Sequence, residues 1–465
     1  GNVGATGTAT SVAGIPFFSD SSNNSIYTHD VSGTDDTAAN NTAYGLTALD
    51  AVTTGDNNTA LGYSAGGGLT SGTSNTSVGF EAMGAGAVTG SENEALGRRA
   101  LKNLTSGDGN VAIGTETLLD TTSGSQNVAV GKQALENCNS GGNNVAVGYQ
   151  TLRNTTGTGN IAIGKETAKS NTSGSRIIAI GAEAYDAADT ENDNLAIGEG
   201  ALGGSVAGGE YNVAIGNNTL DALTSADRNT AVGFNAGTAT TTGGTNTFIG
   251  YAAGAGNTTG GTIVAIGHEA YDVADTENHN LAIGESALGG AVAGGEYNVA
   301  IGNYTLDALT SGDNNTALGY QAGSALTTGV RNVIIGSAAA DAMETASSNV
   351  IIGDEAVGGG VLTADQNVVI GRNAGHDMTS GDNNVLLGFE AGLNQTTASA
   401  NTFVGWKSAG LGTVTGGTNV GVGTQALYDL TSGANNISMG YRSAYELTTG
   451  DKNISIGTFA LKNPD

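Results

Sequence analysis

A five-residue pattern recurs about every 17 residues along almost the whole chain. It reads Asn-Val-Ala-Ile-Gly at residues 110–114, and close variants follow at 127–131 and 144–148. With the glycine of this pattern as position 0, the frame continues from Gly45 to Gly457 through 25 glycines spaced 16 to 18 residues apart. A fixed period of this length is too short for a helical hairpin or a propeller blade and is typical of one turn of a solenoid.

The composition favours short strands joined by tight turns. Glycine supplies 78 of the 465 residues, proline only 2, and charged residues 12%, which is unlike a helical bundle or a charged disordered chain. We therefore predict an all-β fold, a parallel β-solenoid of about 25 coils of about 17 residues, over residues 40–465. Residues 1–39 lie outside the frame and are expected to form an N-terminal capping or attachment segment. At about 4.8 Å per coil, the array would make a rod roughly 120 Å long.

Position −4 of the repeat is Asn in 23 of the 25 coils, and Ile177 and Ile263 are the exceptions. Side chains at equivalent positions stack in a solenoid, so these amides can hydrogen-bond from coil to coil. Asn also suits the tight turn that precedes each strand. We predict a structural asparagine ladder, inward or at a corner of the coil, that includes Asn110, Asn127, Asn144, Asn160 and Asn194.

The residues next to the repeat glycine predict which side chains form the core. Position −1 is apolar in every coil and position −3 is β-branched in most, so strand alternation favours both as core positions. Position −2 should then face away from the core. It is Ala or Ser in the first twelve coils but becomes large and apolar later, and soluble monomers rarely expose such stripes. We therefore predict an oligomer interface at Phe248, Ile334, Ile351, Val369, Leu386 and Phe403.

Charge and cysteine content exclude several classes of partner and linkage. Lys and Arg total 15 against 43 Asp and Glu, a formal net charge of −28, so no nucleic-acid partner is expected. The sequence contains no run of 18 or more apolar residues, so no membrane span is expected. The single cysteine, Cys138, excludes an intrachain disulfide and is expected to be a small buried side chain.

Motifs that resemble catalytic or metal sites fall in variable positions of the repeat. The Gly-x-Ser-x-Gly of residues 62–66 resembles a hydrolase nucleophile turn, but the position of Ser64 holds Asn235 or Glu390 in other coils. Residues 189–194 carry the spaced oxygen ligands of a calcium loop without its glycine at the sixth position or its acid at the twelfth. The four histidines do not cluster in the frame. We predict no catalytic residues, no metal site and no cofactor, and hence no enzyme.

The Asn-Val-Ala-Ile-Gly unit, with its trailing alanine and glycine-rich turn, resembles the head repeats of trimeric autotransporter adhesins and the repeat arrays of phage tail fibres. The resemblance covers residues 40–463, although the coil is somewhat longer here. It implies a left-handed parallel β-roll that assembles as a homotrimer. It also implies display outside the cell, on a cell or virion surface, where the protein holds or touches another surface.

Repeat and resemblance together predict an extracellular structural or adhesive fibre protein that forms a rigid rod and mediates surface attachment. Its expected partners are copies of itself, in a homotrimer or a filament, with a cell-surface receptor or glycan as a further candidate. One alternative is an extracellular filament subunit that stacks end to end. A weaker one is an ice-binding solenoid, which needs a regular threonine rank on a flat face, whereas the threonines cluster in turns, as at 121–122 and 240–242.

Overall fold

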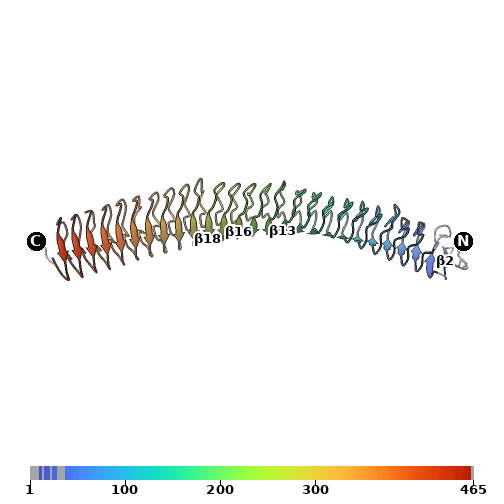
Figure 1. The fold of residues 1–465 in the computed structure, drawn as a ribbon, viewed down its shortest axis with the longest axis horizontal. Coiled ribbons are helices and arrows are strands. Elements are labelled where there is room, and N and C mark those ends of the chain that lie inside the picture. Colours follow the sequence, from blue (N-terminus) through green and yellow to red (C-terminus); the bar gives the residue numbers. More distant parts are fainter. Residues whose placement is uncertain (1–9, 13–14, 21–22, 29–36, 462–465) are drawn as a thin grey trace. The chain divides into compact units, whose positions relative to one another are not determined.

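The computed structural model describes residues 10–12, 15–20, 23–28 and 37–461, and the described residues contain strands and turns but no helix (Figure 1). The chain divides into two compact units, residues 1–228 and residues 229–465. Each unit is a stack of coils that contribute one three-residue strand each to a parallel sheet. The prediction of a parallel β-solenoid with about 25 coils roughly 17 residues apart is confirmed.

The N-terminal unit pairs its strands in parallel and in register from β3 onward. Equivalent repeat positions face each other, as in the pairing of Ala112 with Ala129. Only the first strands differ, because β1 pairs with β2 and β2 with β3 in antiparallel fashion. The strands are β1 Thr10–Val12, β2 Ile15–Asp20, β3 Ser25–Tyr27, β4 Thr42–Tyr44, β5 Thr59–Leu61, β6 Thr76–Val78, β7 Glu94–Leu96, β8 Val111–Ile113, β9 Val128–Val130, β10 Val145–Val147, β11 Ile161–Ile163, β12 Ile178–Ile180, β13 Leu195–Ile197 and β14 Val213–Ile215.

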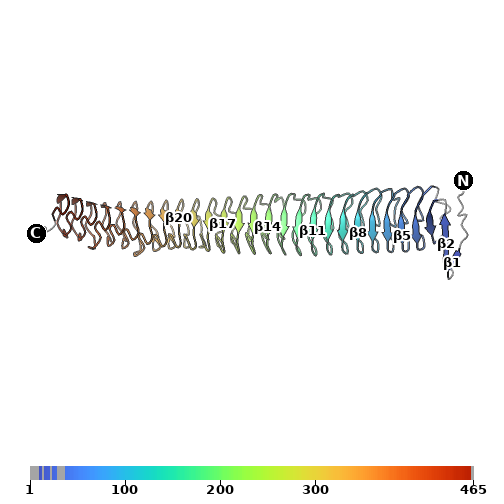
Figure 2. The same cartoon turned by 90° about the horizontal axis from the view of Figure 1, so that it is seen from below.

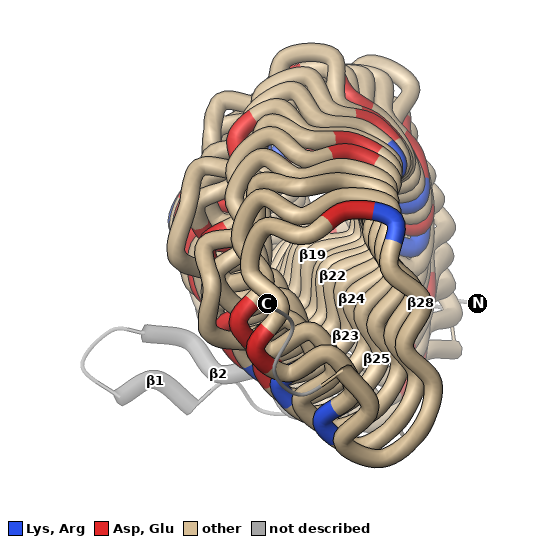
Figure 3. The backbone as a smooth tube through the Cα atoms, turned by 90° about the vertical axis from the view of Figure 1, so that its left-hand side faces the viewer, with Lys and Arg blue, Asp and Glu red and all other residues tan. Residues whose placement is uncertain are grey.

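The C-terminal unit repeats the same arrangement without an antiparallel strand among its described residues. Each strand pairs in parallel with the next, as Ile334 with Ile351, and Figure 3 looks along these coils one behind another. The strands are β15 Thr230–Val232, β16 Thr247–Ile249, β17 Val264–Ile266, β18 Leu281–Ile283, β19 Val299–Ile301, β20 Thr316–Leu318, β21 Val333–Ile335, β22 Val350–Ile352, β23 Val368–Ile370, β24 Val385–Leu387, β25 Thr402–Val404, β26 Val420–Val422, β27 Ile437–Met439 and β28 Ile454–Ile456.

The parallel ladder begins before the predicted boundary at residue 40. Strand β3 already pairs in parallel with β4, and Ser25 occupies the place of the repeat asparagine, where its Oγ accepts a hydrogen bond of 3.0 Å from the backbone N–H of Asn41. Strand β2 lies against the other edge of β3. The described part of the N-terminal segment therefore extends the sheet, while residues 1–9, 13–14, 21–22 and 29–36 lie outside the described residues.

The repeat glycine allows adjacent coils to approach each other closely. Its φ lies in the left-handed half of conformational space, for example +148° at Gly97, which disfavours any residue with a Cβ. A Cβ on Gly97 would also lie only 2.1 Å from the carbonyl oxygen of Gly114 in the next coil. The chain then bends through left-handed residues at positions +2 and +4, such as Glu116 and Leu118. These two features explain why the frame keeps its glycine in every coil.

The core of each coil is the reverse of the sequence prediction. The middle residue of every strand from β4 to β28, position −2, is buried, whereas positions −3 and −1 face outward. The predicted oligomer interface is therefore wrong, because the six side chains assigned to it lie in the interior of a single chain with no exposed surface. These residues are Phe248, Ile334, Ile351, Val369, Leu386 and Phe403.

A narrow interior explains this reversal. In most coils a small residue at −2 shares the core with the side chains at +3 and +4, such as Ala100 and Leu101, which are fully buried. In three of the six coils with a large residue at −2, position +4 is glycine, which leaves room for that residue; in the other three it is Ala340, Val357 or Ala409. A Cβ on Gly254 would lie 2.3 Å from the ring of Phe248, and one on Gly392 would lie 2.9 Å from Leu386. In these two coils a large side chain at −2 takes the space that the side chain at +4 fills elsewhere, as close packing requires.

Candidate functional site

The most unusual surface of each unit is the outward side of its parallel sheet, made by positions −3 and −1 of every strand. We call it the outer sheet face; Figure 2 shows the strands that carry it as a row of arrows. Its aliphatic side chains are well exposed, at 50% for Leu96 and 39% for Ile113 in the N-terminal unit. In the C-terminal unit, Leu318 is 44% exposed and Leu387 is 41% exposed.

The outer sheet face is apolar apart from threonine and one charge. Position −1 is apolar in all 25 coils, and position −3 is Val, Ile, Leu or Thr in all but one, where Glu94 stands. Some of these side chains are exposed and the others are partly exposed, so each unit presents on the order of 1,000 Å² of mostly apolar surface, whereas monomers commonly expose patches of a few hundred Å². This area is comparable to one partner's share of a standard protein–protein interface.

A column of exposed aromatic side chains borders this face at position +1, directly after the repeat glycine. Neighbouring members stack, with ring centroids 5.3 Å apart for Tyr63 and Phe80 and 5.6 Å apart for Phe234 and Tyr251. His268 continues the second stack at 4.9 Å from Tyr251. We call this set the aromatic column; its exposed aromatic members are Tyr63, Phe80, Tyr149, Phe234, Tyr251, Tyr320, Phe389, Trp406 and Tyr441.

The asparagine ladder lies inside the coils and joins three of them at each step. The Nδ2 of Asn127 donates to the Oδ1 of Asn110 at 3.1 Å and to the carbonyl of Gly141 at 2.9 Å. The backbone N–H of Asn127 also donates to the Oδ1 of Asn110, at 3.0 Å. Asn144 repeats the pattern, and Asn160 keeps the backbone contact to Asn144. These amides are buried and bonded within the chain, so they hold the stack rather than a ligand.

A tyrosine repairs the ladder where Ile177 interrupts it. The Nδ2 of Asn194 donates to the hydroxyl of Tyr185 at 3.0 Å, and that hydroxyl donates to the carbonyl of Glu191 at 3.3 Å. Burial raises the pKa of Tyr185 far above its usual range. The second exception, Ile263, is followed by the same arrangement, in which the Nδ2 of Asn280 donates to the hydroxyl of Tyr271 at 3.0 Å.

The threonines lie in the turns, as expected, where they form a rank at position +8 that other residues such as Asn139 and Glu344 interrupt. At position +8, the hydroxyl of one coil donates to the backbone carbonyl of the same position in the next coil. Thr105 bonds to Thr122 in this way at 2.8 Å, and Thr431 bonds to Thr448 at 3.0 Å. These hydroxyl protons are engaged within the chain, so the rank serves to tie adjacent turns together.

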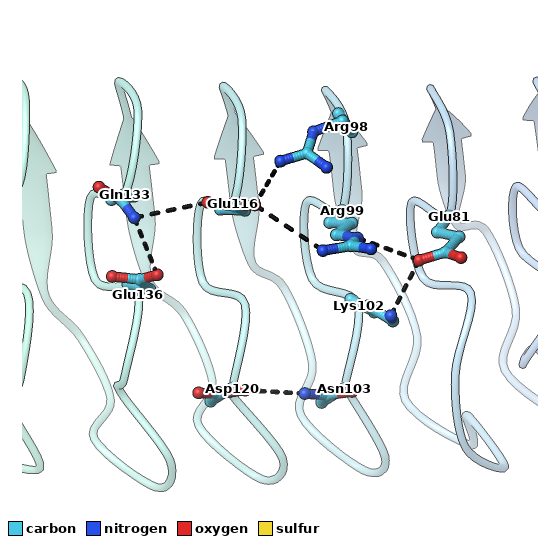
Figure 4. Close-up of polar contacts among 9 residues, drawn as sticks. All are labelled: Glu81, Arg98, Arg99, Lys102, Asn103, Glu116, Asp120, Gln133 and Glu136. Atoms are coloured by element: carbon cyan, nitrogen blue, oxygen red, sulfur yellow. Dashed lines mark hydrogen bonds and ion pairs between the residues drawn. The ribbon is translucent and has the colours of Figure 1, made fainter.

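A network of ion pairs joins neighbouring coils of the N-terminal unit at positions +1 to +5 (Figure 4). The carboxylate of Glu81 meets the Nζ of Lys102 at 2.8 Å and the Nε of Arg99 at 3.1 Å. The hydrogen bond from Lys102 is the main reason that the pKa of Glu81 is lowered. Glu116 lies between the guanidinium groups of Arg98 and Arg99. Exposed pairs of this kind contribute little stability individually, so the network is a minor term.

The candidate catalytic and metal motifs remain separate from one another. Ser64 lies at position +2 in the left-handed bend. Glu191, within the calcium-like stretch, is buried and accepts hydrogen bonds from the backbone N–H groups of Asp189, Thr190 and Gly208 at 2.9 to 3.1 Å. Among the residues that the structure describes, no group of three His, Cys, Asp or Glu side chains could hold a metal ion. Within the same residues, no helix is long and apolar enough to cross a membrane.

Comparison with protein-family models and with curated proteins finds no match for this chain. The outer sheet face and the aromatic column are therefore the features on which a function can be argued. The sequence did not predict the outer sheet face, because strand alternation favoured the same residues as core positions. Glycine at +4 beside a large residue at −2, as in Gly254 with Phe248, favours the opposite choice, but only three of the six coils with a large residue at −2 have it.

Proposed function

We propose that this chain is a structural fibre protein whose copies associate side by side through the outer sheet face, as a homotrimer. We further propose that it works outside the cell, on a cell or virion surface, in attachment. The exposed apolar rows of the outer sheet face are the observation that carries the assembly. The resemblance of the repeat to adhesin heads and tail fibres supports the location and the attachment.

The partner that fits the outer sheet face best is another copy of the chain. The face repeats every coil, and a second copy carries rows with the same spacing. Burying on the order of 1,000 Å² at about 25 cal/mol per Å² gives roughly 25 kcal/mol before the costs of association, which take up a large part of it. A lateral assembly therefore has enough apolar surface to be stable.

The alternative of end-to-end stacking meets an obstacle at the first coil. In the N-terminal unit, β2 lies antiparallel along the edge of β3, Ser25–Tyr27, that faces away from β4. Another copy cannot add a parallel strand at that edge while β2 occupies it. Blocked edges of this kind suppress edge-to-edge association. We therefore favour lateral over end-to-end association.

Charged substitutions on the outer sheet face test the assembly. Glu94 shows that one strand already carries an acid at position −3, so Ile161→Glu with Ile163→Glu in β11 should leave the coil folded. We expect sedimentation to show at least a tenfold loss of affinity between copies, since charges would enter an apolar contact, with an unchanged circular dichroism spectrum. The matched control is Ser106→Glu with Ser123→Glu, two exposed turn positions. Equal masses for both double variants would contradict lateral assembly through this face.

The attachment part of the proposal needs a separate measurement. Fluorescently labelled protein should bind intact cells or a glycan array, and binding should fall by at least tenfold in Ile161→Glu with Ile163→Glu because the multivalent form is lost. An assembled protein that binds no cell and no glycan would contradict the attachment role and leave the structural role.

A further inference from the structure

Two outward positions of the coil vary together along the chain. Position −3 begins each strand, and position +1 follows the repeat glycine. Threonine stands at −3 in seven coils, and in all seven the residue at +1 is a large apolar side chain. The pairs are Thr42 with Leu46, Thr59 with Tyr63, Thr76 with Phe80, Thr230 with Phe234, Thr247 with Tyr251, Thr316 with Tyr320 and Thr402 with Trp406.

The remaining 18 coils behave differently. Position −3 is larger there, mostly Val, Ile or Leu, and position +1 is polar, charged or alanine in all but three of them. The three exceptions are Tyr149, Phe389 and Tyr441. Threonine at −3 thus accompanies an apolar or aromatic residue at +1, whereas Val, Ile or Leu at −3 mostly accompanies a polar or charged residue or alanine. A pairing of this kind is expected of two positions that contact the same surface.

The two positions do not share a space within one chain. They lie on either side of the bend at the repeat glycine, and position −1 stands between them on the outer sheet face. Both side chains are turned outward: in the C-terminal unit Trp406 is 45% exposed and Thr402 is partly exposed. Along the stack, each side chain contacts the side chain at the same repeat position of the neighbouring coil, as when Tyr63 packs on Phe80. A contact between chains accounts for this pairing.

The glycine bend indicates how two chains would meet. Strands β4 to β28 end at position −1 and the chain turns at the repeat glycine, so position +1 lies at one corner of the coil. Position −3 lies at the opposite end of the strand. When copies surround a common axis with their outer sheet faces inward, the corner after one strand meets the start of the neighbouring copy's strand. A cyclic arrangement of this kind closes on itself.

We propose that, in the assembled fibre, the large residue at +1 of one copy packs over the threonine at −3 of the next copy around a threefold axis. This inference rests on the proposed lateral assembly and adds to it the contact that sets its geometry. The aromatic column then forms the edge of the interface. Because each threonine is small, it leaves space for the large residue at +1 of the neighbouring copy. In coils with Val or Ile at −3, this larger side chain itself fills that space.

Trp406 tests this contact directly because it is the only tryptophan in the chain. Trp406 is 45% exposed in a single chain, and its indole should be covered by a neighbour's Thr402 on assembly. We expect its emission to shift to shorter wavelength and acrylamide quenching to fall at least threefold between dissociated and assembled protein. Unchanged quenching in protein that sedimentation shows to be assembled would overturn this inference and leave the proposed function intact.

Cysteine pairs determine the symmetry. In a Cys138→Ser background, Thr402→Cys with Trp406→Cys should not form a disulfide within one coil, because the two positions lie at opposite ends of β25. Oxidation should link the copies into closed covalent trimers on a denaturing, non-reducing gel. The matched control, Thr402→Cys with Ser432→Cys at an exposed turn position, should stay monomeric on the same gel. Covalent dimers alone, or monomers from an assembled sample, would overturn the threefold contact.

Discussion

At the scale of single residues, stability rests on buried amides that bond in both directions along the stack. Asn127 lies at the centre of such a set, since it donates to Asn110 and Gly141 and accepts from Asn144. Truncating it would leave several buried polar groups without partners, and each such group costs about 1–3 kcal/mol.

We therefore expect Asn127→Ala to lower the free energy of unfolding by about 2–4 kcal/mol. Urea denaturation followed by circular dichroism would measure it, and hydrogen exchange would place the loss in the coils around residue 127. Asn154→Ala provides the control, because Asn154 is exposed and the hydrogen bond that its side chain accepts from Asn137 lies on the surface. Equal losses in the two variants would show that the ladder does not carry the stack.

Two aspartates of the N-terminal unit should change the stability of the fold with pH in opposite directions. Burial raises the pKa of Asp186, with a smaller contribution from Glu183, whereas the hydrogen bond from Arg176 lowers the pKa of Asp193. A raised pKa means that the stabilising contribution of the carboxyl is present below its ordinary pKa of 3.8 and is lost as the pH rises. A lowered pKa contributes stability above that value, and this contribution is lost as the pH falls.

Asp186→Asn should therefore raise the melting temperature at pH 7, and the gain should vanish below pH 3.8, the ordinary pKa. Asp193→Asn should lower the melting temperature at pH 7, again with no difference at low pH. Thermal melts of both variants and the unmodified protein between pH 3 and pH 7 would measure these shifts. The same sign for both variants would contradict the assigned causes.

At the scale of the element, the sequence of a three-residue strand does not determine which of its side chains face the core. The repeat period and the glycine frame predicted the 25 coils from β4 to β28 but not the parallel strand β3 that precedes them, and the asparagine column predicted an inward or corner ladder. Alternation alone could not decide whether −2 or the pair −3 and −1 faces inward, because both choices have period two. The answer depends on the other half of the coil, where Leu101 or Gly254 sets the space available at −2.

The exchange of side-chain volume between positions −2 and +4 gives a prediction for β16. Phe248→Ala should cost about 3–5 kcal/mol because it leaves a cavity in a close-packed core. Adding Gly254→Leu should restore a large part of that loss, since leucine occupies the same left-handed position in coils such as that of Leu101. Urea denaturation of the single and double variants would measure both effects. A Phe248→Ala variant as stable as the unmodified protein would indicate that this side chain is on the surface.

At the scale of the whole molecule, the sequence predicted assembly for the wrong residues. An exposed apolar stripe was expected at −2, but the structure places that stripe inside the chain and exposes positions −3 and −1 in both units. The exposed apolar surface is larger than the one expected, because it runs along both units rather than a few coils of one. The candidate site could not be located from the sequence, since it is made by residues that resemble a core.

The mass of the unmodified protein in solution tests the central proposal most directly. Sedimentation equilibrium at micromolar concentration and neutral pH should give three times the chain mass of 45.6 kDa, because the outer sheet face is buried between copies. A stable particle of 45.6 kDa at that concentration would show that the outer sheet face faces water and would contradict the account.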